Sequence, residues 1–215
     1  RTEDLEEFCK NVRAKSSYVS VDTEFIREET YWPILCLIQL GIPGHSLLLD
    51  PMDDCLSLEP LRDLFLDESI VKVFHSGRQD LEIFYHLWGL FPKPLFDTQV
   101  AAMACGFPDS VSFERLVRDL VHESLDKSQA HTRWDSRPLN HEQIQYALND
   151  VVYLCPVYEI LRDQLNLTHR SSWIEDEMLW LVNPENYDPN PMDLWKKISI
   201  KTQNPQVLCR LQYLC

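Results

Sequence analysis

Four acidic residues and one tyrosine are the side chains whose types and spacing could carry out chemistry. Asp22 and Glu24 stand two apart in an apolar stretch, so on a strand both carboxylates point to one face. Asp80 lies farther along the chain, and Tyr146 and Asp150 stand four apart, on one face of a helix. Carboxylate oxygens suit Mg²⁺ or Mn²⁺, and two such cations roughly 4 Å apart can hydrolyse a phosphodiester. The set therefore predicts two-metal phosphodiester hydrolysis.

Each of these residues also has a structural explanation that competes with the chemical one when it is taken alone. Asp22 and Glu24 could lie on a strand edge that faces water. Asp80 could complement the dipole at the N-terminus of a helix, and Tyr146 and Asp150 could hydrogen-bond each other. The chain contains no Walker A loop, HExxH, GxSxG or zinc-finger spacing that would indicate another chemistry. The prediction of a metal site therefore depends on the combination.

The strands that would position these side chains follow from the pattern of apolar residues and turn residues. Strands first, then alternating strands and helices, indicate an α/β or α+β sheet covered by helices. The first three strands form an antiparallel meander in this interpretation, with a turn at 42–44. The expected strands are 18–25, 34–41, 45–50, 71–75 and 95–97.

Capping signals place the helices. Ser76 and Gln79 predict a capping box that would put Asp80 in the first helical turn, at the carboxyl end of a strand where open sheets commonly build sites. Asn140 and Gln143 predict a second capping box at the start of a long helix. Asp97 predicts the N-cap of a further helix that ends at Gly106. The expected helices lie at about 3–15, 57–67, 77–88, 98–105 and 141–166.

Length and composition describe an ordinary globular chain. It has 215 residues, of which 45% are hydrophobic and 25% charged, enough for one substantial domain or one domain with a small appendage. Prolines at 184, 189 and 191 mark a linker. We therefore expect a domain over 1–183, a linker over 184–191, and the incomplete start of a helical domain over 192–215.

Charge and cysteine content restrict the partners and the compartment. A net charge of −14 argues against general affinity for nucleic acid, because phosphate contacts need Lys and Arg, but it leaves room for a narrow groove. No apolar run approaches the roughly 18 residues that span a bilayer, so we expect no membrane contact. Seven cysteines without a CxxC pair favour free thiols and a reducing, cytoplasmic location.

The five candidate residues lie within longer blocks that resemble the DEDD exonucleases and, among them, the ribonuclease D family. The resemblance covers nearly the whole chain, and the block at 21–33 is more specific than any acidic pair. The matching blocks are VDTEFIREETYWP at 21–33, LCLIQ at 35–39, FHSGRQDLE at 74–82, FDTQVAA at 96–102, LDKS at 125–128, RPL at 137–139 and QYALNDV at 145–151.

This resemblance implies a ribonuclease H-like, mixed five-stranded sheet with helices on both faces. It implies that Asp22, Glu24 and Asp150 hold one Mg²⁺ or Mn²⁺, and that Asp22 bridges to a second cation with Asp80, directly or through water. Tyr146 would place the chain in the tyrosine subclass. The implied activity is 3′→5′ removal of nucleoside 5′-monophosphates from single-stranded RNA 3′ ends, such as those of tRNA precursors. The end of the chain resembles the start of a helicase-and-RNase-D C-terminal domain.

Candidate substrate contacts are cations for phosphates or rings for a terminal base: Phe25, Arg27, Lys127, Trp134 and Arg137. Arg27 could instead pair with the glutamates at 28 and 29, and Trp134 could be a core residue. His75 is interpreted as a structural hydrogen-bonding residue. Two other functions remain open at this point: an exonuclease of DNA or of very short oligoribonucleotides, and a catalytically silent interaction module.

Overall fold

The computed structural model describes residues 1–28, 30–126, 128–130, 132–188, 204, 206, 207 and 210. The chain divides into two units, Arg1–Val182 and Asn183–Cys215. The first unit carries the sheet and the helices α1 to α7. The expected boundary near residue 183, the linker and the helical start at 192–215 stay predictions, since most of the second unit lies outside the described residues.

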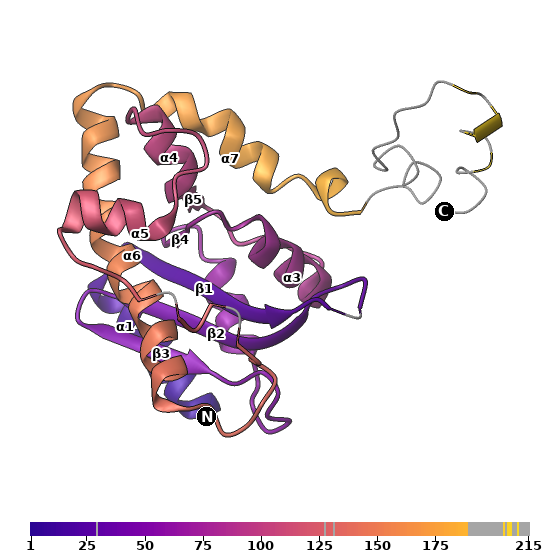
Figure 1. The fold of residues 1–215 in the computed structure, drawn as a ribbon. Helices are drawn as coiled ribbons and strands as arrows, with labels where there is room; N and C mark the ends of the chain where they lie inside the picture. Colours follow the sequence, from indigo (N-terminus) through magenta and orange to yellow (C-terminus); the bar gives the residue numbers. More distant parts are fainter. Residues whose placement is uncertain are drawn as a thin grey trace. The chain divides into compact units, whose positions relative to one another are not determined.

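A mixed five-stranded sheet forms the centre of the first unit, in the order β3-β2-β1-β4-β5 (Figure 1). The first three strands pair antiparallel as a meander, and β4 and β5 add on in parallel. The expected sheet, with its meander, is confirmed. The strands are β1 (Tyr18–Ile26), β2 (Ile34–Ile42), β3 (His45–Leu49), β4 (Val71–Phe74) and β5 (Leu95–Asp97).

Helices cover both faces of this sheet. Figure 1 shows α6 in front of the meander and α1 behind it. Two short elements before α6 were not expected from the sequence, α5 and the π-helical turn Val117–Val121. The helices are α1 (Thr2–Lys15), α2 (Glu59–Phe65), α3 (Arg78–Trp88), α4 (Thr98–Ala104), α5 (Phe113–Leu116), α6 (His141–Leu167) and α7 (Glu175–Leu181), with short 3₁₀ turns at Ser171–Ile174 and Pro184–Asn186.

One of the two predicted capping boxes is present. At the start of α6, the Gln143 backbone N–H donates to Asn140 Oδ1 at 2.7 Å, and the Asn140 N–H donates to Gln143 Oε1 at 3.1 Å. The box predicted for Ser76 and Gln79 is wrong, because Gly77 is the N-cap of α3 and no side chain caps it. The long helix that carries Tyr146 and Asp150 therefore begins at the residue predicted from the sequence.

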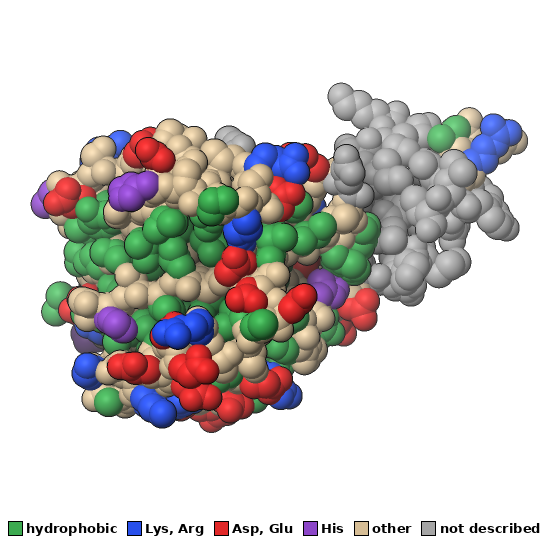
Figure 2. Space-filling view, turned by 90° about the horizontal axis from the view of Figure 1, so that it is seen from below, with side chains coloured by type: hydrophobic (Ala, Val, Ile, Leu, Met, Phe, Trp, Pro, Cys, Tyr) green, Lys and Arg blue, Asp and Glu red, His purple; other side chains and the backbone are tan. Residues whose placement is uncertain are grey.

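The described cysteines are reduced, as expected from their spacing, and the described surface carries charges of both signs. The described cysteines are free: Cys9, Cys36, Cys55, Cys105 and Cys155. On the face in Figure 2, Lys and Arg side chains are interspersed with acidic ones. Several described arginines form ion pairs, among them Arg13 with Asp67 and Arg162 with Asp163. None of the helices that the structure describes is long and apolar enough to cross a membrane.

Candidate active site

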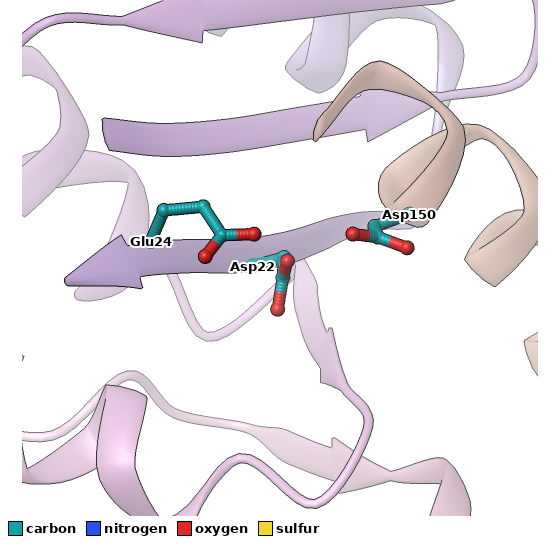
Figure 3. A group of neighbouring side chains, drawn as sticks. All are labelled: Asp22, Glu24 and Asp150. Carbon is teal, nitrogen blue, oxygen red and sulfur yellow. The ribbon is translucent and has the colours of Figure 1, made fainter. Parts of the chain in front are cut away.

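Three carboxylates from two elements meet on one face of the sheet. Asp22 and Glu24 come from β1 and Asp150 comes from α6, and each offers an oxygen within 4.8 Å of the others. Figure 3 shows Asp150 on the helix facing the two acids on the strand. All three side chains are partly buried. The structure thus brings together three of the four acids that the sequence singled out.

The close approach of α6 to the sheet explains why Asp150 reaches Asp22. The Ser20 hydroxyl lies 2.8 Å from the Val151 carbonyl oxygen and 2.9 Å from that of Gly41. A Cβ atom on Gly41 would stand 2.6 Å from Ser20 Oγ and 3.0 Å from the Val151 oxygen. A side chain at position 41 would therefore force the helix away from the strands, and Asp150 with it.

The three carboxylates lie close together and are partly buried, so water screens the repulsion between their negative charges only weakly. Burial raises the pKa of Asp22 well above its usual value, and the charge of Asp150 raises it further. Burial raises the pKa of Glu24 to about 10, with added contributions from Asp22, Asp150 and Asp80. Such a group is unfavourable without a compensating positive charge. Three carboxylates within reach of one another are also the oxygen donors that hard divalent cations take. The donor set fits a cation.

Asp80 stands apart from this group. It lies in the first turn of α3, is 7% exposed, and accepts a hydrogen bond from the Thr23 hydroxyl. Thr23 alternates with Asp22 and Glu24 along β1, so its side chain points to the other face of the strand. Burial raises the pKa of Asp80 well above its usual value, and Asp22 raises it further. The structure therefore places Asp80 within electrostatic reach of Asp22 but outside the three-carboxylate group.

Asp97 fixes the turn that delivers Asp80. Its carboxylate accepts hydrogen bonds from the backbone N–H groups of Ser76 and Gly77, at 3.0 and 2.8 Å. It also accepts from the Gln99 N–H at 2.8 Å, which caps α4 as expected. Ser76 has a positive φ of 55°. The cap was predictable from the sequence, but the bonds to Ser76 and Gly77 were not, because the parallel pairing of β4 and β5 brings the turn and the aspartate together.

Tyr146 and Phe113 line the space in front of the carboxylates. A cavity of about 210 Å³ is bounded by Asp22, Glu24, Asp150 and these two rings, together with Thr23, His75 and Leu154. A neighbouring cavity of about 290 Å³ shares Phe113, Tyr146 and Asp150 with it. Burial raises the pKa of Tyr146, and Asp150 raises it further, so the phenol stays protonated. Phe113 was not predicted as a site residue, since the short helix α5 has no sequence pattern strong enough to indicate it.

His75 has the structural role expected for it. Its Nδ1 lies 3.0 Å from the Thr98 hydroxyl oxygen, and its ring packs at 5.3 Å from that of Phe113. The histidine therefore links α4 to the wall of the cavity rather than joining the carboxylate group.

Trp134 and Arg137 are both engaged within the fold, and their expected contacts with substrate stay predictions. Trp134 is 2% exposed and packs in a cluster with Cys36 and other apolar residues, so neither face of its ring is open to a base. Arg137 pairs with both carboxylate oxygens of Asp50. Its remaining N–H groups donate to the carbonyl oxygens of Cys36, Trp134 and Ser136 at 2.7 to 2.9 Å.

The structure treats the three other candidate substrate contacts, Arg27, Phe25 and Lys127, differently. Arg27 forms an ion pair with Glu82 at 2.7 Å and donates to the Tyr31 carbonyl oxygen. Of the two glutamates expected as alternative partners, the one at position 29 lies outside the described residues. Phe25 is partly buried near the end of β1. Lys127 lies outside the described residues. The substrate contacts of all five candidates stay predictions, and Arg27 would have to leave Glu82 to meet a phosphate.

Comparison with known proteins agrees with this geometry. Residues 1–166 match the family model described as a 3′-5′ exonuclease. The chain is 46% identical over 212 residues to ribonuclease D of Bartonella henselae, covering 99% of this chain and 52% of that protein. The chain spans about half the length of the curated relatives it matches.

Solved structures show the same fold. Escherichia coli RNase D, described as an exoribonuclease involved in structured RNA processing, matches with a TM-score of 0.84 and 33% identity over 98% of this chain and 57% of that chain. Brucella melitensis NrnC with bound Mg²⁺ matches with a TM-score of 0.69 and 25% identity, over 88% of this chain and 92% of that one. The sheet and its helices are the ribonuclease H-like fold that the resemblance implied, and the chain belongs to the 3′-5′ exonuclease family.

Proposed function

We propose that this chain is a divalent-metal-dependent 3′→5′ exoribonuclease that releases nucleoside 5′-monophosphates from single-stranded RNA 3′ ends. The observation that carries the proposal is the grouping of Asp22, Glu24 and Asp150 around one point, in front of a partly buried tyrosine. Membership of the 3′-5′ exonuclease family supports the direction of the reaction. The name of the relatives, ribonuclease D, supports RNA as the substrate.

Asp22, Glu24 and Asp150 would hold the first Mg²⁺ or Mn²⁺. Asp22 would also bind a second cation, together with Asp80 acting directly or through water. The charge of Asp22 raises the pKa of Asp80 after burial has done so, and this proximity of the two carboxylates supports the pairing. When bound, such a pair of cations supplies a water nucleophile at neutral pH and stabilises the departing oxygen.

The remaining side chains orient the reacting groups. Burial keeps the Tyr146 phenol protonated, so its hydroxyl can donate a hydrogen bond to the phosphate or accept one from the attacking water. Phe113 presents a ring on the wall shared by the two cavities, and base stacking on such rings is tolerant of sequence. Phe25 and Lys127 remain candidate contacts at the edge of the site.

The negative charge of the chain predicts that the divalent cations bind before the RNA. With a net charge of −14 and partly buried carboxylates in the cavity, an RNA phosphate would meet repulsion unless the cations were already in place. RNA binding is therefore expected to depend on divalent metal. Trimming of tRNA precursors or other small RNAs, in a reducing cytoplasmic compartment, fits this site and the free cysteines.

A polarity assay tests the proposal. Single-stranded RNA with a 5′ label, incubated with the chain and Mg²⁺ or Mn²⁺, should shorten one nucleotide at a time from the 3′ end. EDTA, a 3′-blocked RNA, and Asp22→Asn or Asp150→Asn should each stop the shortening. Matched DNA and dinucleotide substrates test the alternative specificities. Unchanged turnover in both variants, or shortening from the 5′ end, would contradict the assignment.

A further inference from the structure

Gln39 on β2 is a polar residue whose hydrogen bonds are not satisfied within the fold. Its side chain is 0% exposed, and neither its amide nitrogen Nε2 nor its oxygen Oε1 has a hydrogen-bond partner among the described residues. Buried polar side chains nearly always have a partner, so an amide without one calls for an explanation. The mechanism above does not use this residue.

The sheet register places Gln39 directly beside a metal-ligand candidate. Asp22 on β1 and Gln39 on β2 are cross-strand partners in the antiparallel pair. Such partners share one face of the sheet, and their Cβ atoms lie roughly 5 Å apart. The face is the one that α6 covers, as the contact between Gly41 and Val151 shows. The Gln39 amide and the Asp22 carboxylate therefore lie side by side beneath the helix that carries Asp150.

The other neighbours of Gln39 on the sheet offer no polar side chain. Leu48 stands opposite Gln39 on β3. Leu37 and Gly41 precede and follow it by two positions on β2, on the same face. Of these four neighbours, Asp22 alone has a side chain that can accept or donate a hydrogen bond. A side-chain rotation of Gln39 or Asp22 is enough to join them, since both are flexible beyond Cβ.

We propose that Gln39 is a positioning residue of the metal centre, whose amide N–H donates to the Asp22 carboxylate and holds it in the orientation that binds the cation. The inference rests on the proposed function, since it requires that Asp22 be a ligand. Ligating carboxylates are usually held by hydrogen bonds of this kind. A neutral amide suits the place, because a lysine or arginine there would neutralise the ligand and repel the cation.

The proposal and a purely structural role predict opposite results for Gln39→Met, which removes the amide and keeps the length of the side chain. If the amide has no partner in the metal-free fold, an apolar replacement should leave the thermal stability in EDTA unchanged or higher. If the amide positions Asp22, the same variant should weaken Mn²⁺ binding by about 10- to 100-fold. A structural role would lower the stability without a separate effect on the metal.

Mn²⁺ titration followed by electron paramagnetic resonance, with thermal unfolding in EDTA, tests this on the whole chain. Gln39→Met and Gln39→Leu should both bind Mn²⁺ more weakly and unfold no earlier than wild type. Leu48→Met, on the other side of Gln39, is the matched control and should bind as wild type does. Equal Mn²⁺ affinity in the variants would overturn the inference, and so would earlier unfolding of both in EDTA.

The outcome for the wild-type chain separates this inference from the proposed function. A wild-type chain that binds no Mn²⁺ would remove the metal site itself. A wild-type chain that binds Mn²⁺, with Gln39→Met binding equally well, would leave the site intact and remove only the role of Gln39.

Discussion

Asp150 on α6 and Asp22 on β1 bring carboxylate oxygens within 4.8 Å of each other, although they come from opposite ends of the domain sequence. After burial, Asp150 is the main cause that raises the pKa of Asp22. The repulsion between the two carboxylates is therefore expected to lower the stability of the metal-free protein, and in the proposed function the same pair binds the cation. The arrangement that would bind a cation is thus expected to destabilise the metal-free fold.

Asp150→Asn should separate these two effects. Without the charge of Asp150, the metal-free protein should gain about 1 kcal/mol, which raises the melting temperature by roughly 2–4 °C. The same variant should lose the stabilisation that Mn²⁺ gives to wild type. Differential scanning fluorimetry with EDTA or Mn²⁺ measures both. Asp163→Asn, at an exposed position of the same helix, is the control and should change neither value by more than a few tenths of a kcal/mol.

The pH dependence of the metal-free protein should report Glu24. Its pKa is raised from 4.5 to about 10 in the fold, so between these values the folded state holds a proton that the unfolded state has released. The free energy of unfolding should then fall as the pH rises through this window. Urea unfolding in EDTA at several pH values measures the slope. Glu24→Gln should have a shallower slope, and equal slopes would show that Glu24 is not perturbed.

Local sequence signals predicted the framework of the site well. The meander, the α6 capping box of Asn140 and Gln143, and the spacing of Asp22 and Glu24 all depend on residues close together in the chain. Such signals fix which face of a strand or helix a side chain occupies. They were enough to place three acids on facing elements.

Contacts between distant segments account for what the sequence missed. Arginine is a residue type that often contacts phosphates, but the partner of Arg137 is Asp50, which follows the end of β3. No local sequence pattern joins the two. Asp80 follows a strand as expected, yet the Thr23 hydroxyl holds its carboxylate away from the three-carboxylate group. Gln39 stands out only once the register of β1 and β2 is known.

Arg137→Gln should test the structural assignment of this arginine. Its loss leaves carbonyl oxygens and the Asp50 carboxylate without their donor, so we expect a loss of about 1–3 kcal/mol in the free energy of unfolding. RNA affinity and its salt dependence should be unchanged, whereas loss of a phosphate contact would reduce the salt slope by about one. Urea unfolding and fluorescence anisotropy at several salt concentrations measure these quantities. A reduced salt slope without loss of stability would instead support the predicted contact with substrate.

Tyr146→Phe should slow the chemical step without removing the metal. The ring still packs against the cluster around Trp134, and the three carboxylates are untouched, so the Mn²⁺ affinity should match wild type. Loss of the orienting hydroxyl should lower kcat by roughly 100-fold or more. Single-turnover RNA cleavage and Mn²⁺ titration measure the two effects. Tyr153→Phe, on the same helix but outside the carboxylate cavity, should behave as wild type, and full activity of Tyr146→Phe would exclude the orienting role.

Gly41→Ala should weaken cation binding from a position that carries no ligand. The added Cβ would stand 2.6 Å from Ser20 Oγ and 3.0 Å from the Val151 oxygen, so α6 must shift outward and carry Asp150 away from Asp22. We expect a loss of about 1–3 kcal/mol in stability from overpacking, together with a weaker Mn²⁺ affinity. Adding Ser20→Ala removes the nearest atom and should restore part of both. If Gly41→Ala loses stability but binds Mn²⁺ as wild type does, the position of α6 does not set the ligand geometry.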